Sequence, residues 1–297
     1  MNPQELKIIF MGTPEFGALI LKAMVENGYR PVLVVTVPDK PVGRKKILTP
    51  PPVKIEAEKQ GIEIRQPKKI KEILEEMKNI QPDLIITAAY SKILPKDVLD
   101  LPKSCINIHP SLLPKYRGPS PVQHAILNGD KKTGVTIMLM DEQIDHGAIL
   151  AQKEMNIDPK ETGAGLHTKL ALLGSNLLLE VIPAWLAGEI KAIPQNHSLA
   201  TFTKILKRDD GLIDWDKSPE EIERKIRAFT PWPGAYTFFD KNGVKTRLKI
   251  LESFLENGKL VLVLVQPEGK KQMAFSDFLR GNPQFKNNEK ICLHIQI

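Results

Sequence analysis

The chain has 297 residues, 42% of them hydrophobic and 26% charged, which is typical of a soluble globular protein with room for two domains. Its two cysteines match no metal or redox spacing and its six histidines are scattered singly, which argues against a zinc site and for a reducing compartment. No apolar run approaches the roughly 20 residues that span a bilayer, so we expect a cytoplasmic protein without membrane contact. The net charge of +7 suits a polyanionic partner such as nucleic acid.

Strands and helices alternate through the first two-thirds of the sequence. Short apolar runs predict strands at 7–11, 31–37, 62–64, 83–89 and 104–108, with helical patterns between them. A strand pair at 135–140 and 149–157 and a long apolar helix at 165–188 follow. Alternation of this kind predicts an α/β domain over residues 1–189, built on a doubly wound, mostly parallel sheet.

The last third of the sequence has a different pattern of apolar residues. Residues 190–206 are mixed in character and are interpreted as a linker. In residues 207–297 one helix, capped by Ser218, precedes short β-like runs at 235–239, 247–254, 260–265, 272–275 and 291–297. Short strands separated by turns predict a small C-terminal β-barrel, of the kind that binds oligonucleotides.

Asn107 and His109 carry the strongest chemical signal in the chain. They are two residues apart at the end of the strand 104–108, so both side chains point to the same face. Ligands of open α/β sheets bind at such strand ends, and an amide donor beside an imidazole suits charge growing on a carbonyl oxygen. From the spacing alone, a histidine that merely caps the strand is an equally good interpretation.

Two further segments are candidates for function. Asp145 lies beside a turn glycine, where its carboxylate could reach His109, although a solvated acidic turn is the simpler interpretation. The loop at 40–46 is rich in cations that could neutralise phosphates, and we favour that function over an inert surface loop. Its cations are Lys40, Arg44, Lys45 and Lys46.

Nearly the whole chain resembles the methionyl-tRNA formyltransferase family. The segment 107–114, Asn-Ile-His-Pro-Ser-Leu-Leu-Pro, is specific to folate-dependent formyltransferases as a group. The corner 230–236, together with a small C-terminal domain, narrows the resemblance to the tRNA enzymes. Further matching segments are 12–16, 38–46, 116–118 and 144–147, whereas His146 stands where the family usually has a small hydroxylated residue.

The resemblance implies transfer of the formyl group of 10-formyltetrahydrofolate to the amino group of methionyl initiator tRNA, without a metal. By position, Asn107 and His109 would stabilise the oxyanion, and Asp145 would orient His109 and help to remove the proton of the amine. The implied domains are a Rossmann-like formyltransferase domain and an OB-like tRNA-binding domain. Nothing in the sequence suggests a helix for self-association, so we expect a monomer. The implied folate pocket comprises Ala88, Ala89, Tyr90, Ser111, Leu112, Leu113 and Pro114.

Two alternatives stay open at this point. Formyltransferases that act on glycinamide ribonucleotide or on amino sugars could share Asn107, His109 and Asp145. A protein that binds RNA without catalysing a reaction would need only the basic loop and the small barrel. It would leave the three polar side chains as a coincidence.

Overall fold

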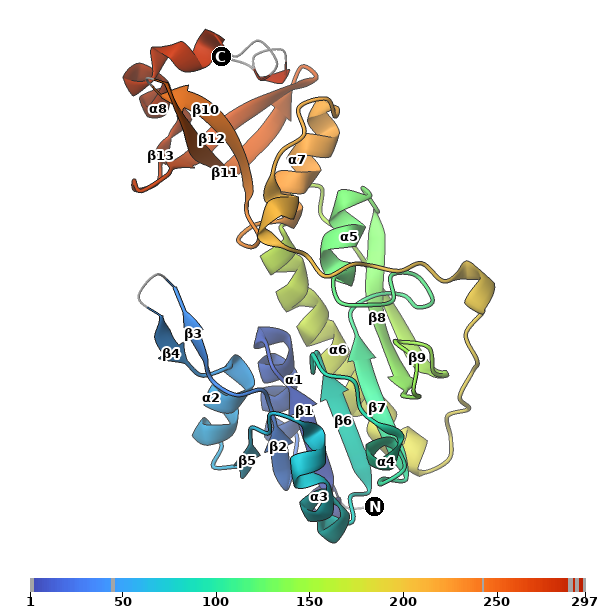
Figure 1. The fold of residues 1–297 in the computed structure, drawn as a ribbon. Coiled ribbons are helices and arrows are strands. Elements are labelled where there is room, and N and C mark those ends of the chain that lie inside the picture. The colour runs from blue at the N-terminus through green and yellow to red at the C-terminus, as the bar shows by residue number, and fades with distance from the viewer. Residues whose placement is uncertain (1–2, 44–45, 242, 288–290, 292–293, 296–297) are drawn as a thin grey trace. The chain divides into compact units, whose positions relative to one another are not determined.

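The computed structural model describes residues 3–43, 46–241, 243–287, 291 and 294–295. The chain divides into two compact units (Figure 1). The first comprises Met1–Pro121, Thr133–Met155 and His167–Thr203. The second comprises Val122–Lys132, Asn156–Leu166 and Lys204–Ile297. The predicted linker 190–206 therefore belongs mostly to the first unit, and its Ile193 pairs with Ile149 through a β-bridge.

A seven-stranded sheet in the order β5-β2-β1-β6-β7-β8-β9 forms the centre of the first unit. The strands from β5 to β7 are parallel and β8 runs antiparallel to β7, so the predicted mostly parallel sheet is confirmed. All five residues of β1 and of β6 are buried, as expected of central strands covered on both faces. The bounds are β1 Ile8–Gly12, β2 Leu33–Val35, β5 Ile64–Arg65, β6 Leu84–Ala88, β7 Ser104–His109, β8 Lys132–Leu139 and β9 Ile149–Asn156.

Helices connect these strands and cover the sheet (Figure 1). They are α1 Glu15–Glu26, α2 Pro52–Lys59, α3 Leu74–Ile80, α4 Lys96–Leu99 and α6 Gly163–Leu186, with short 3₁₀ turns at Pro3–Glu5, Ile70–Ile73 and His197–Leu199. By length and composition α6 could cross a membrane, but a core helix passes the same test. Leu170, Leu178 and Ile182 of α6 are fully buried within the protein, which is the pattern of a core helix.

The basic loop contains a β-hairpin, which the sequence analysis did not predict. Strands β3 Lys40–Val42 and β4 Ile47–Thr49 pair antiparallel. Gly43 and Lys46 both adopt positive φ at the turn, and the Lys46 N–H donates to the Gly43 carbonyl. Of the predicted cations, Arg44 and Lys45 lie outside the described residues.

The second unit contains a four-stranded antiparallel sheet in the order β10-β11-β12-β13, in the region where the sequence predicted short strands separated by turns. A register shift beyond Ile250 interrupts the pairing of β11 with β12. At the predicted last strand, 291–297, the structure describes a single bridge, from Ile295 to Leu260. The elements are α5 Pro121–Leu127, a 3₁₀ turn Arg208–Gly211, α7 Pro219–Ala228, β10 Ala235–Lys241, β11 Val244–Glu256, β12 Lys259–Pro267, β13 Met273–Ala274, α8 Phe275–Gly281 and a 3₁₀ turn Pro283–Asn287.

The sequence explains how helix α7 begins and what it packs against. Ser218 and Glu221 form a capping box at the start of α7, as predicted. Ile222 and Ile226, one turn apart on α7, pack into the same core as Leu248 and Ile250 of β11. Phe275 and Phe278 of α8 belong to the same core, so the core of the second unit lies between helices α7 and α8 and the antiparallel sheet.

Candidate active site

His109 lies at the carboxyl end of β7 and is only 5% exposed. Its Nε2 lies 2.9 Å from the carbonyl oxygen of Tyr116, which can only accept a hydrogen bond, so Nε2 carries a proton. Its Nδ1 lies 3.5 Å from Oδ1 of Asp145. The other ring nitrogen, Nδ1, therefore faces the carboxylate of Asp145.

Asp145 lies in the segment between β8 and β9, and it is in contact with His109 and with two other groups. Oδ1 accepts a long hydrogen bond of 3.4 Å from Nδ2 of Asn107, and Oδ2 accepts one of 2.7 Å from the backbone N–H of Gly118. Its φ of 48° places it in the left-handed region, which residues other than glycine rarely adopt. The three predicted catalytic side chains are thus brought together, with Oδ1 of Asp145 at their centre. Their roles in catalysis stay a prediction.

Asn107 is oriented by a residue that the sequence analysis missed. The hydroxyl of Thr87 donates to Oδ1 of Asn107 at 2.7 Å, so the amide nitrogen points toward Asp145. Thr87 on β6 is the register partner of Asn107 on β7, and side chains paired in this way lie on the same face. Both strands were predicted, but nothing in the sequence shows that they are neighbours in this register.

The predicted folate segment Ser111–Pro114 follows His109 directly and is held by hydrogen bonds. Ser111 is fully buried, and its hydroxyl donates to the Lys115 carbonyl at 2.6 Å. The Leu113 N–H donates to Oγ1 of Thr136 at 3.0 Å, and its carbonyl accepts from Gln152 at 2.8 Å. The Ser111 hydroxyl is thus engaged within the protein, whereas Leu112 and Pro114 are half-buried. Folate binding by this segment stays a prediction.

The other predicted folate residues lie at the end of β6, next to β7. Ala88 is fully buried, and Ala89 is exposed with a positive φ of 52°. The Tyr90 hydroxyl is buried and has no hydrogen-bond partner among the described residues, and burial raises the pKa of Tyr90 to about 12. A buried hydroxyl without a partner is the kind of group that a bound ligand can satisfy.

The hairpin β3–β4 is anchored at its base. The Asp39 carboxylate accepts hydrogen bonds from Gln66 and from the Lys54 ammonium, both at 2.7 Å, and these bonds lower the pKa of Asp39. Beyond this anchor the hairpin side chains, including Lys40 and Lys46, are exposed. The hairpin thus presents cations to solvent on a fixed base.

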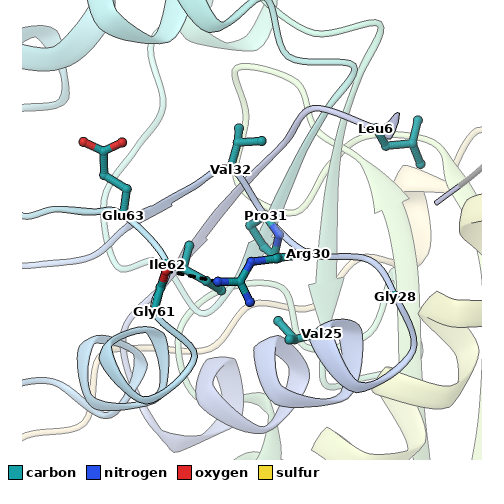
Figure 2. A pocket seen from close by; sticks show the side chains of 9 residues that line it. All are labelled: Leu6, Val25, Gly28, Arg30, Pro31, Val32, Gly61, Ile62 and Glu63. Atoms are coloured by element: carbon teal, nitrogen blue, oxygen red, sulfur yellow. Dashed lines mark hydrogen bonds between the residues drawn. The ribbon is translucent and has the colours of Figure 1, made fainter. Parts of the chain in front are cut away.

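A separate pocket lies at the amino-terminal ends of β1, β2 and β5, whereas the candidate site lies at the carboxyl end of β7 (Figure 2). Figure 2 shows the Arg30 guanidinium reaching the backbone at Gly61, to which it donates at 3.0 Å. The other lining residues are Leu6, Val25, Gly28, Pro31, Val32, Ile62 and Glu63. None of the predicted site residues lines this pocket, so we do not assign it to catalysis.

No group of three or more His, Cys, Asp or Glu side chains is placed to hold a metal ion in the part of the chain that the structure describes. Cys105 on β7 is buried, which raises its pKa to about 12 and leaves its thiol protonated at neutral pH. That the protein works without a metal stays a prediction.

Comparison with known proteins finds a family match for the N-terminal and for the C-terminal region of the chain. Residues 6–182 match the family described as formyl transferase, and residues 205–259 match the formyl transferase C-terminal domain. The methionyl-tRNA formyltransferase of Bacillus velezensis is 44% identical over 93% of this chain and 94% of its own length. A relative of the same name from Geobacillus is 46% identical over the same shares.

A solved structure has the same fold as this chain. The methionyl-tRNA formyltransferase from Clostridium thermocellum aligns with a TM-score of 0.60 and 22% identity, over 88% of this chain and 98% of that one. At this level of identity the likeness concerns the fold alone.

Proposed function

Because the chain belongs to the methionyl-tRNA formyltransferase family, we propose that it transfers the formyl group of 10-formyltetrahydrofolate to the α-amino group of methionyl initiator tRNA. The observation that carries the proposal is the convergence of Asn107, His109 and Asp145 at the carboxyl end of β7. Strand ends of open α/β sheets are where substrates bind. We infer a cytoplasmic location, since charged tRNA and folate are both found in the cytoplasm. A monomer stays our expectation.

The chemistry follows from the donors that meet at Asp145. The neutral amine attacks the formyl carbon, a carbon–nitrogen bond forms, and the carbonyl oxygen becomes an oxyanion. The amide Nδ2 of Asn107 has a second N–H that can donate to that oxygen, and in this proposal the N–H on Nδ1 of His109 turns from Asp145 to the oxyanion as negative charge grows there. The bond to N10 of the folate then breaks, the amine loses one proton, and N10 gains one.

Asp145 has two roles in this reaction. Its carboxylate lies 3.5 Å from Nδ1 of His109 and orients the imidazole ring through that nitrogen. We also assign Asp145 as the base that accepts the proton that the amine releases. Its second oxygen is held by the Gly118 N–H, so the carboxylate cannot rotate without losing a hydrogen bond.

We assign RNA binding to the hairpin β3–β4 and to the C-terminal unit. Lys40 and Lys46 project from the hairpin, and Arg44 and Lys45 of the same segment add to its positive charge. Clustered cations of this kind bind phosphates and release counterions. The folate site, by contrast, is assigned to Tyr90 and to the residues after His109.

The test is formylation of methionyl initiator tRNA by the purified protein, with 10-formyltetrahydrofolate as donor. His109→Ala is expected to lower kcat by about 100- to 1,000-fold, the usual cost of one oxyanion donor. His124→Ala removes another histidine of the chain and is the matched control. Transfer to glycinamide ribonucleotide or an amino sugar instead of the tRNA would assign a different substrate, and tRNA binding without transfer would refute catalysis.

A further inference from the structure

We propose that Arg117 and Gln195 are positioning residues that hold the loop 141–147 so that the Asp145 carboxylate stays against His109. The inference rests on the catalytic roles proposed above for Asp145 and His109. Neither residue touches the reacting atoms in this proposal. Both are almost completely buried, Arg117 at 4% and Gln195 at 5% exposed.

Gln195 uses its whole side-chain amide to connect two segments. Its Nε2 donates to the carbonyl of Asp145 at 2.9 Å and to that of Gly147 at 2.8 Å. Its Oε1 accepts from Nε of Arg117 at 3.2 Å and from Nη2 at 2.6 Å. Both amide hydrogens and both lone pairs are therefore engaged, which defines one orientation of the side chain.

The two carbonyls that Gln195 binds bracket the strained part of the loop. Asp145 has a φ of 48°. At Gly147 an added Cβ would lie 2.0 Å from the carbonyl oxygen of Leu139, so the backbone passes too close to β8 for any side chain. A loop in such a conformation persists only where its surroundings hold it, and Gln195 supplies two of the hydrogen bonds that do so.

Arg117 lies between the two residues that contact the catalytic pair. Its predecessor Tyr116 accepts from Nε2 of His109, and its successor Gly118 donates to Oδ2 of Asp145. Fixing the Arg117 side chain on Gln195 therefore ties the segment that holds His109 to the loop that carries Asp145.

The electrostatics of Arg117 agree with a role beyond packing. Among the described residues its guanidinium has no carboxylate partner and binds the Gln195 amide and Nδ1 of His197, the latter at 2.8 Å. A buried charge without a counterion costs stability, and buried arginines are normally paired with acids. A planar, forked donor suits the geometry of the Gln195 oxygen, and lysine would not reproduce it.

Gln195→Glu removes the hydrogen bonds to the loop 141–147 and keeps the contact with Arg117. The carboxylate keeps the size of the side chain and pairs with Arg117, but it has no N–H to donate to Asp145 and Gly147. We expect kcat to fall by about 10- to 100-fold, because small misplacements of catalytic groups have effects of that size. KM for both substrates should stay within about twofold of wild type. Gln60→Glu adds the same charge at the end of α2 and should change neither quantity.

A double-mutant cycle with Asp145→Asn distinguishes positioning from a general structural role. If Gln195 acts through Asp145, adding Gln195→Glu to Asp145→Asn should lower kcat by less than about threefold further. Multiplication of the two losses, or an unchanged kcat in Gln195→Glu alone, would overturn the proposal. A wild-type protein that forms no formylmethionyl-tRNA would instead refute the proposed function.

Arg117→Lys provides an independent variant should Gln195→Glu fold poorly, as judged by its thermal unfolding midpoint. It keeps the positive charge but cannot bind Oε1 through two nitrogens. The same selective fall in kcat, again lost in the Asp145→Asn background, is expected. A rise in KM for both substrates with kcat unchanged would show that Arg117 shapes the binding site and would overturn the proposal.

Discussion

The hydroxyl of Thr87 offers a sensitive test of how Asn107 is oriented. Thr87→Val replaces the hydroxyl by a methyl group of similar size, and Thr87 is only 2% exposed, so the strand β6 should keep its packing. The variant removes the 2.7 Å hydrogen bond to Oδ1 of Asn107. The contact of 3.4 Å with Asp145 then remains as the bond that orients the amide.

The expected size of the effect follows from that single bond. A buried, neutral hydrogen bond contributes about 1 to 1.5 kcal/mol, and the amide oxygen of Asn107 is left without its donor. If this free energy is lost from the transition state, kcat falls by about 5- to 13-fold. KM should change little, because the amide serves the oxyanion and not the bound substrates.

The assay is steady-state formylation of methionyl initiator tRNA at saturating concentrations of both substrates. Thr87→Ser is the matched control, since it keeps the hydroxyl and loses the methyl group, and its kcat should stay within about twofold of wild type. Equal rates for Thr87→Val and wild type, with both proteins folded, would refute the reasoning, because they would show that the orientation of Asn107 does not limit catalysis.

Three further predictions concern the RNA site, the pH dependence of stability and the folate site. Replacing Lys40 and Lys46 together with Arg44 should raise the apparent KM for tRNA and flatten its salt dependence, with KM for the folate unchanged; equal effects on both substrates would contradict a role in RNA binding. Burial lowers the pKa of His167, so the folded protein holds the neutral imidazole more readily than the charged one. The stability that the neutral ring provides is present above about pH 6.5 and is lost as the pH falls below that value. Thermal unfolding midpoints from about pH 7.5 to about pH 5.5 should therefore fall less steeply in His167→Gln than in wild type; parallel slopes would contradict this. Tyr90→Phe should leave the unfolding midpoint unchanged, since the hydroxyl has no partner among the described residues. If a bound folate satisfies that hydroxyl, the variant should raise KM for the folate by about 3- to 10-fold. A lower midpoint would instead reveal a partner within the protein.

The fold could be predicted from local patterns to a large extent. Apolar runs with helices between them indicated the parallel sheet, and the central strands β1 and β6 are buried as those runs required. The basic segment after Asp39 was identified only as a loop, and its β-hairpin was not predicted. Its hairpin depends on positive φ at Gly43 and at Lys46, and a lysine gives little sign of that conformation in a sequence.

The candidate site was predictable only in part. Asn107 and His109 were identified because a strand places residues two apart on one face. Asp145 was a candidate from its place beside a turn glycine, but only the resemblance favoured it over a solvated acidic turn. Gln195 was missed because it lies in a stretch interpreted as a linker, although its side chain is buried and binds the loop of Asp145.

The sequence by itself determined what depends on neighbouring residues: the alternation of strands and helices, the shared face of Asn107 and His109, and the cap at Ser218. The tertiary structure alone decided which distant groups meet. Thr87 orients Asn107 because β6 and β7 pair in one register, and Gln195 reaches the loop of Asp145 across 50 residues of chain. Such contacts depend on register and burial, which arise from the packing of the whole sheet and leave no periodic signal in the chain.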